Sequence, residues 1–128
     1  MFRIKMTPNE RRLQMAIPKP LKRSVSEQLT HYCDRKFPLH LRDKVWATHH
    51  WRGDTVTLSE WRPRFNDPTQ FVDIKIAQMR LDTATGLWSL FCADRNGKWH
   101  RYYETDSTPD FAALLQEVDE DPTGVFWG

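Results

Sequence analysis

Aromatic and basic side chains alternate in two short runs of this 128-residue chain. One run is Trp61-Arg62-Pro63-Arg64-Phe65, and the other extends from Arg95 to Tyr103. Exposed aromatic rings stack on nucleobases at about 1–3 kcal/mol per base, while Arg and Lys neutralise phosphates. The runs therefore predict a sheet face that binds nucleic acid, as a single strand, or another phosphate-rich ligand. The candidate contact residues are Trp61, Arg62, Arg64, Arg95, Lys98, Trp99, His100, Arg101 and Tyr102.

A purely structural interpretation of the same rings stays open. Trp and Tyr side chains pack across neighbouring strands and stabilise a sheet without any ligand, and Arg stacks over them. Residues two apart on a strand share a face, so one of two sets must enter the core and the other must face out. The sets are Lys98, His100 and Tyr102, and Trp99, Arg101 and Tyr103. With six Trp in the chain, we expect one or two at a surface that meets a ligand.

One acid-x-Lys pattern imitates half of a nuclease signature. Asp73-Ile74-Lys75, preceded by Asp67 or Glu60, has the residue types that hold Mg²⁺ and orient a water molecule. The pattern arises easily by chance in a chain with 28% charged residues. Nucleases of this type also need a helical crossover where another antiparallel strand is expected here. A metal-dependent hydrolase or nuclease is therefore kept only as a remote alternative.

The histidines and cysteines form no recognised metal motif. The chain lacks CxxC, HxxxH and HExxH, and neighbours such as His49-His50 point to opposite sides of a strand. A site assembled from His40, His50 and His100 stays open. The nucleophile motif GxSxG and Gly-rich phosphate loops are also missing. The sequence thus reveals no reaction, and we expect no catalytic residue, no metal and no cofactor.

Charge is divided unevenly along the chain. Residues 1–50 hold eleven Lys or Arg against four Asp or Glu, whereas residues 51–128 hold eight against thirteen. A basic N-terminal arm is typical of proteins that bind phosphates or acidic lipids. Residues 104–121, in contrast, contain seven acids and no base. The alternative is that arm and acidic segment neutralise each other, within a monomer or across a small homo-oligomer such as a dimer.

Five consecutive strands are expected to carry the aromatic and basic runs. The β-rich segments cover residues 44–52, 55–65, 71–82, 87–94 and 98–104, and a turn signal separates each from the next. Gly53-Asp54 suits a type II′ turn, Asn96-Gly97 a type I′ turn, and residues 83–86 a loop with a left-handed Gly. These connections are too short for parallel crossovers, so the pattern predicts an antiparallel meander. The expected core residues are Val56, Leu58, Val72, Ile74, Ile76, Trp88 and Leu90.

Amphipathic segments on either side of the strands predict two helices packed on one sheet face, and hence an α+β fold. A capping box, Ser24-x-x-Glu27, opens the first helix, and Thr108-Pro109-Asp110 opens the second. Their apolar stripes are Val25, Leu29, Tyr32 and Cys33 in the first, and Phe111, Leu114, Leu115 and Val118 in the second. Prolines interrupt residues 1–23, which we expect to form a separate basic arm with a short helix over residues 8–16. The single domain then spans residues 24–128.

The chain ends in the apolar segment Val125-Phe126-Trp127-Gly128. Such an end is more often tucked into a core than left free. The alternative is that Val125, Phe126 and Trp127 enter a partner's groove or pair with its sheet edge. The protein would then be an interaction or regulatory module that also uses its acidic segment.

Six stretches resemble one bacterial family of domains of unknown function, whose members end in Pro-Thr-Gly-(Ile/Val)-Phe-Trp-Gly. The stretches are residues 38–43, 56–63, 67–68, 85–88, 94–100 and 121–128. The most specific are Asp94-Arg95-Asn96-Gly97-Lys98-Trp99-His100 and the closing octapeptide. The resemblance covers about residues 25–128 and implies a small bacterial protein of the cytosol. It implies no catalytic or ligand-binding residue.

Composition narrows the class of protein. Two cysteines make no disulfide framework, which fits a reducing compartment such as the cytoplasm. No apolar stretch approaches the roughly 20 residues of a membrane span, so we expect no membrane partner. The sequence therefore favours a cytoplasmic, non-catalytic module that binds nucleic acid or a phosphate-rich ligand, with a protein-interaction module as the alternative.

Overall fold

The computed structural model describes residues 16–128. The first fifteen residues of the predicted arm, with nearly all of the helix expected over residues 8–16, lie outside this part. The elements in chain order are α2 (Lys19–Lys36), the 3-10 helix η1 (Leu39–Leu41), β1 (Trp46–Arg52), β2 (Thr55–Pro63), β3 (Phe71–Asp82), β4 (Leu87–Ala93), β5 (Trp99–Arg101) and α3 (Phe111–Glu120).

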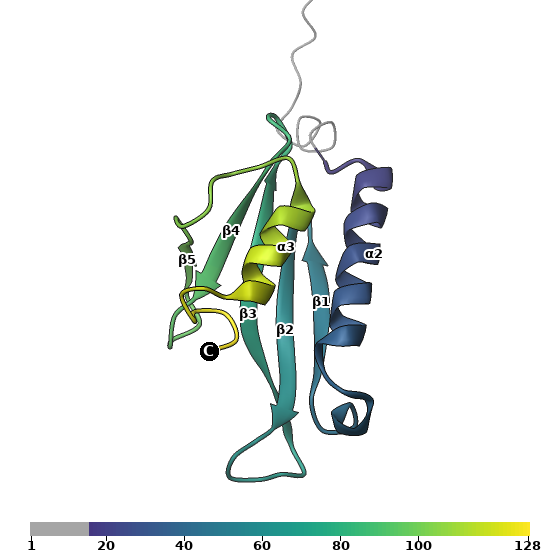
Figure 1. The fold of residues 1–128 in the computed structure, drawn as a ribbon, viewed down its shortest axis with the longest axis vertical. Coiled ribbons are helices and arrows are strands. Elements are labelled where there is room, and N and C mark those ends of the chain that lie inside the picture. Colours follow the sequence, from purple (N-terminus) through teal and green to yellow (C-terminus); the bar gives the residue numbers. More distant parts are fainter. Residues whose placement is uncertain (1–15) are drawn as a thin grey trace, which may run out of the picture.

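The five strands form one antiparallel sheet in the order β1-β2-β3-β4-β5. Both long helices lie on the same side of it, with α2 along β1 and α3 over the middle strands (Figure 1). The predicted α+β meander is therefore confirmed. The opposite side of the sheet carries no helix among the described residues, and we call it the open face.

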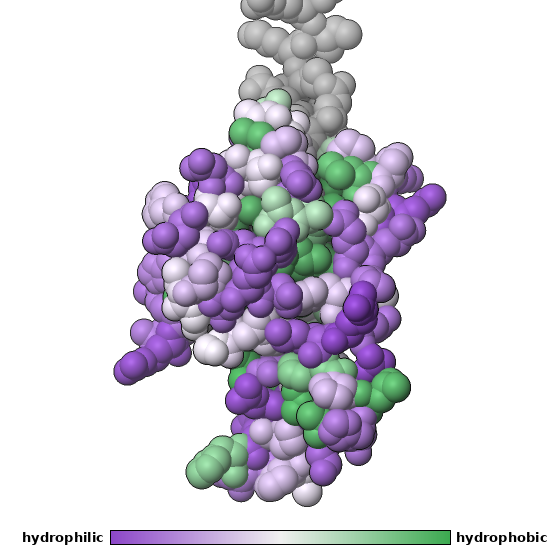
Figure 2. Space-filling model, in the orientation of Figure 1, coloured by the Kyte–Doolittle hydropathy of each residue, from purple (hydrophilic) through white to green (hydrophobic). Residues whose placement is uncertain are grey.

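The hydrophobic core fills the space between the sheet and the two helices. Trp88 is fully buried there, with its ring centroid 5.0 Å from that of Phe111 and 6.3 Å from that of Trp51. Five of the expected core residues are buried, while Val72 and Ile74 are half-buried. On the helix side, hydrophilic residues cover most of the surface, and apolar patches remain beside α2 and at the end that carries η1 (Figure 2).

The first helix begins earlier than the capping box predicted. Pro18 is its N-cap residue, and Ser24 lies well inside it without capping the N-terminus. Proline is tolerated in the first turn because those N–H groups have no partner within the helix. Pro18 and Pro20 therefore start α2 rather than separate it from the arm, and the predicted start at Ser24 is wrong.

Turn geometry follows the prediction at two hairpins and departs from it at one. Gly53 has φ +62° before Asp54, as a type II′ turn requires, and Gly86 has φ +74° at the end of its loop. Between β4 and β5 only Gly97 has positive φ, so the predicted type I′ turn is wrong. Instead the Asp94 carboxylate accepts hydrogen bonds from the N–H groups of Asn96 and Lys98, which closes a three-residue loop.

A bulge in β3 decides which of its side chains reach the open face. Leu58 pairs with Ala77, but the next residue of β2, Ser59, pairs with Lys75, so Ile76 has no partner. Ile76 and Ala77 are both buried. Beyond the extra residue the alternation of faces is reversed. The bulge thus places Lys75 and Arg80, which are an odd number of residues apart, on the same open face.

The C-terminal segment folds back onto the helix side. Asp121, in the left-handed region at φ 46°, accepts hydrogen bonds from the N–H groups of Phe126, Trp127 and Gly128. Phe126 is buried against Tyr102. Trp127 donates from its indole N–H to the hydroxyl of Tyr32 at 3.0 Å. These contacts fasten the chain end to α2 and to the core.

Candidate functional site

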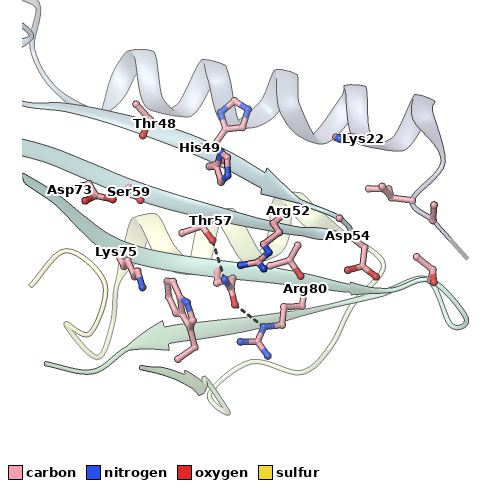
Figure 3. A pocket seen from close by; sticks show the side chains of 18 of the residues that line it. Lys22, Thr48, His49, Arg52, Asp54, Thr57, Ser59, Asp73, Lys75 and Arg80 are labelled. Atoms are coloured by element: carbon pink, nitrogen blue, oxygen red, sulfur yellow. Dashed lines mark hydrogen bonds between the residues drawn. The ribbon is translucent and has the colours of Figure 1, made fainter. Parts of the chain in front are cut away.

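The open face displays its side chains in rows that cross the strands (Figure 3). The register places residues of neighbouring strands opposite each other, so polar and basic groups line up from β1 toward β5. One row consists of Arg52, Thr55, Arg80 and Ser89, and the next of His50, Thr57, Gln78, Phe91 and Arg101. Gln78 donates to Thr57 within its own row and accepts from Arg80 of the neighbouring row, so one hydrogen bond connects the two rows.

Two arginines flank one aromatic ring on this face. The guanidinium carbon of Arg80 lies 3.8 Å from the ring centroid of Phe91, and that of Arg101 lies 5.8 Å from it. Arg101 also donates to Ser107 at 2.7 Å and lies 5.7 Å from the ring of Tyr103, which is 83% exposed. The ring quadrupole attracts both cations.

Further along the strands the face becomes more aromatic. The ammonium of Lys75 lies 5.8 Å from the ring centroid of Trp99. Trp46 and Trp61 stack nearly parallel across β1 and β2, with centroids 6.2 Å apart, and Phe71 packs against Trp46 at 5.1 Å. Basic groups therefore lie toward one end of the face and rings toward the other, with Lys75 and Trp99 between them.

The cations of the open face have no acidic partner in the described chain. The ion pairs within 4.0 Å among residues 16–128 involve Lys36, Arg62 and His100. None involves Arg52, Lys75, Arg80 or Arg101. The face also carries Asp73 and Asp82, and a carboxylate oxygen of Asp82 accepts the Ala84 N–H in the adjoining turn. The charge balance of the face is therefore positive.

A wide, open groove runs over this face. Its floor includes Thr57, Lys75 and Arg80, and Lys22 from α2 stands at its rim (Figure 3). The groove is open along its length rather than enclosed, which suits an extended ligand better than a small molecule held on all sides.

The family model described as a domain of unknown function (DUF3024) matches residues 17–128. The chain belongs to the DUF3024 family. No curated protein and no solved structure matches it at a significant level. The matched region starts just before α2 and includes residues 17–23, which were predicted to belong to the arm.

Only some of the residues predicted from the two aromatic and basic runs meet on the open face of the DUF3024 domain. Trp61 of β2 lies there, as do Trp99 and Arg101 of β5. Arg64 is exposed in the loop after β2, and Arg95 and Lys98 are exposed in the turn after β4. The structure therefore brings three of the nine together.

The remaining three predicted residues belong to the helix-covered side. Arg62 forms an ion pair with the buried Glu60, and Tyr102 is 4% exposed in the core. His100 contacts the Asp94 carboxylate at 2.7 Å. That hydrogen bond, with those from the N–H groups of Lys98 and Asn96, lowers the pKa of Asp94. These groups stabilise the fold of the DUF3024 domain and do not face the groove.

Sequence reasoning missed Arg52, Arg80 and Lys75, the most exposed cations of the face. Arg52 follows from the turn already identified. Because Gly53-Asp54 is a two-residue turn, Arg52 must pair with Thr55 and lie on the side opposite the core residue Val56. Lys75 follows from alternation, since it lies between the expected core residues Ile74 and Ile76. Arg80 depends on the β3 bulge, because uninterrupted alternation from Ile76 would place it on the helix side.

The residues considered for metal chemistry do not converge in the described part of the DUF3024 domain. No group of three or more His, Cys, Asp or Glu among residues 16–128 could hold a metal ion. His50 lies on β1 and His100 on β5, at opposite edges of the sheet. Glu60 points to the helix side, away from Asp73 and Lys75.

The Cys33 thiol bears on the possibility of cysteine chemistry. Burial, followed by the nearby Asp34 charge, raises the pKa of Cys33 to about 11, so the thiol stays protonated near neutral pH.

Of the tail residues considered for partner binding, Phe126 is buried, Trp127 is half-buried, and Val125 is 44% exposed. No helix in residues 16–128 has the length and apolar character to cross a membrane.

Proposed function

We propose that the DUF3024 domain binds nucleic acid through the open face. The supporting observation is that Arg52, Lys75, Arg80 and Arg101 lie on this face with no carboxylate within 4.0 Å in residues 16–128. Cations left without acidic partners along an open groove attract a polyanion.

The electrostatic part of this proposal has a quantitative consequence. Each phosphate neutralised on a single strand releases counterions and contributes about −0.7 to the slope of log K against log salt concentration. Four contacts on the open face therefore give a slope of about −2.8. Affinity that depended on apolar contact alone would change little with salt.

The experiment compares two double variants of the full chain that remove the same charge from opposite sides of the sheet. Lys75→Gln/Arg80→Gln changes the open face, and Arg23→Gln/Arg35→Gln changes exposed positions on α2. Binding of labelled oligothymidylate is measured by fluorescence anisotropy between about 50 and 200 mM salt. We expect the open-face variant to bind more weakly and its slope to become shallower by about 1.4, with the control unchanged.

The proposal is wrong if wild-type protein shows no affinity at about 50 mM salt or an affinity that does not change up to 200 mM. It is also wrong if both double variants lose the same amount of affinity. That result would assign binding to the overall charge of the chain and not to the open face.

A further inference from the structure

We infer that the ligand of the open face is a single strand whose bases stack on the face, and that duplexes are not its substrate. This inference rests on the proposed function and specifies the class of nucleic acid. It is carried by the contacts of Lys75, Arg80 and Arg101 with aromatic rings, by the shape of the sheet, and by the spacing of the cations.

Two cations of the open face each lie next to an aromatic ring, so one nucleotide can contact both the cation and the ring. The Arg80 guanidinium lies 3.8 Å from the Phe91 ring and the Lys75 ammonium 5.8 Å from the Trp99 ring. A phosphate that reaches either cation brings its own nucleotide within reach of the adjacent ring. An unpaired base then gains stacking energy, whereas the bases of a duplex are already stacked inside it and gain none.

The open face also lacks an element that would enter a duplex groove. The major groove of DNA admits an α-helix or a two-stranded ribbon. Both α2 and α3 lie on the opposite side of the sheet, and the hairpin turns lie at the ends of the strands (Figure 1). Among residues 16–128, no element protrudes from the open face to enter a groove of a duplex. Such a surface suits a flexible single-stranded nucleic acid that lies along it.

The spacing of the cations indicates how the strand lies. Arg52, Arg80 and Arg101 belong to β1, β3 and β5, so a cation occurs on every second strand. Neighbouring strands are about 4.8 Å apart, which places the first and last of these strands about 19 Å apart. We therefore expect the nucleic acid to cross the strands, with its phosphates along the arginines and its bases toward Trp99.

The test compares three ligands with the same backbone chemistry on the full chain: a single-stranded oligothymidylate of about 15 nucleotides, an abasic strand of equal length, and a duplex of equal length. Wild-type protein should bind the oligothymidylate more tightly than either of the others. The abasic strand keeps the phosphates and removes the bases, so its loss of affinity measures stacking directly.

Ring variants connect that stacking to the open face. Trp99→Leu keeps an apolar side chain and should weaken oligothymidylate binding by about 5- to 150-fold, the fold-change that corresponds to one base stack. The abasic strand should bind this variant as it binds wild type. Phe65→Leu is the matched control, because Phe65 is fully exposed in the loop after β2 and should have no effect. If Trp99→Leu does not fold, Tyr103→Leu replaces it, since that ring is exposed.

The outcomes separate this inference from the proposed function. Equal affinity for all three ligands, or a Trp99→Leu loss as large on the abasic strand as on oligothymidylate, overturns single-strand stacking. In that case the Lys75→Gln/Arg80→Gln salt slope still decides the proposed function independently. Failure of wild-type protein to bind any of the three ligands overturns both.

Discussion

The position of His49 on the buried face of its strand changes the pKa of its side chain. It lies on the helix-covered side of β1 opposite Leu58, and burial lowers its pKa below the ordinary 6.5 because the imidazolium loses hydration. The unfolded chain therefore binds the proton more readily than the folded one. The free energy of unfolding is complete above the unfolded pKa and falls as pH drops through about 6.5 toward the folded pKa. We expect urea denaturation to show this loss between about pH 7 and pH 5.

The neighbouring histidine provides the control for this prediction. His50 is exposed on the open face, one residue away on the same strand. His49→Gln should flatten the pH dependence in that window, while His50→Gln should leave it as in wild type. A flat profile in wild-type protein, or equal effects of the two substitutions, would show that His49 is not the group responsible.

The same alternation explains which site residues could be predicted. Trp99 and Arg101 are two apart and share the open face, as their spacing indicated, whereas Tyr102 between them is in the core. A run of consecutive aromatic and basic residues describes composition, but a pleated strand divides it between two environments. Arg62 and His100 were therefore grouped with residues they do not meet. Arg80 was missed because it lies outside both runs.

The apolar pattern of β3 carried a signal for the bulge. Val72, Ile74 and Ile76 alternate in one phase, and Ala77, Met79 and Leu81 alternate in the other. A change of phase inside an unbroken strand indicates one inserted residue. Extending only the first phase predicted the core residues before the bulge and gave no account of those after it. The phase change at Ile76 also places Arg80 on the same face as Lys75, although the two are an odd number of residues apart, so this local detail decides part of the candidate site.

The C-terminal tail gives a prediction about one folded segment. The Asp121 carboxylate accepts three backbone N–H groups from residues 126–128. Asp121→Asn keeps the size and tolerates the left-handed backbone, but it replaces an accepting oxygen with a donor. We expect the free energy of unfolding to fall by about 1–3 kcal/mol in urea denaturation, because hydrogen bonds to a charged group are lost.

An exposed residue of the same tail is the control for Asp121→Asn. Val125 is 44% exposed, so Val125→Ala should change the free energy of unfolding by no more than about 0.5 kcal/mol. If both variants are as stable as wild type, the tail is not fastened by Asp121. Trp127 would then be the residue to test as a free partner-binding group.

The whole topology was accessible from the sequence because each hairpin has its own local signal. Gly53, Gly86 and Gly97 all adopt positive φ at the positions where the turns were expected. Short turns leave an antiparallel meander as the only connection, so the fold follows without knowledge of side-chain packing. The groove is different, because it depends on residues from β1 to β5 that are far apart in the chain. Its composition becomes apparent only when the register of every strand pair is known.

On the scale of the entire domain, the acidic helix α3 and the cations of the open face lie on opposite sides of the sheet. The acids of α3, which include Glu117 and Glu120, lie on the helix side, and the cations Arg52 and Arg80 lie on the open face. Packed layers are about 10 Å apart. That separation exceeds the Debye length of about 8 Å at 0.15 M ionic strength but is well within the 30 Å at 0.01 M. The acids should therefore weaken nucleic-acid binding only at low salt.

Glu117→Gln/Glu120→Gln tests this long-range effect. We expect tighter binding of oligothymidylate than wild type at about 10 mM salt and no difference at about 0.15 M, measured by fluorescence anisotropy. The gain at low salt should be smaller than the loss caused by Lys75→Gln/Arg80→Gln, because the acids act through the thickness of the domain while the cations touch the ligand. A gain that persists at 0.15 M would place the ligand next to α3, on the helix side, and would contradict binding at the open face.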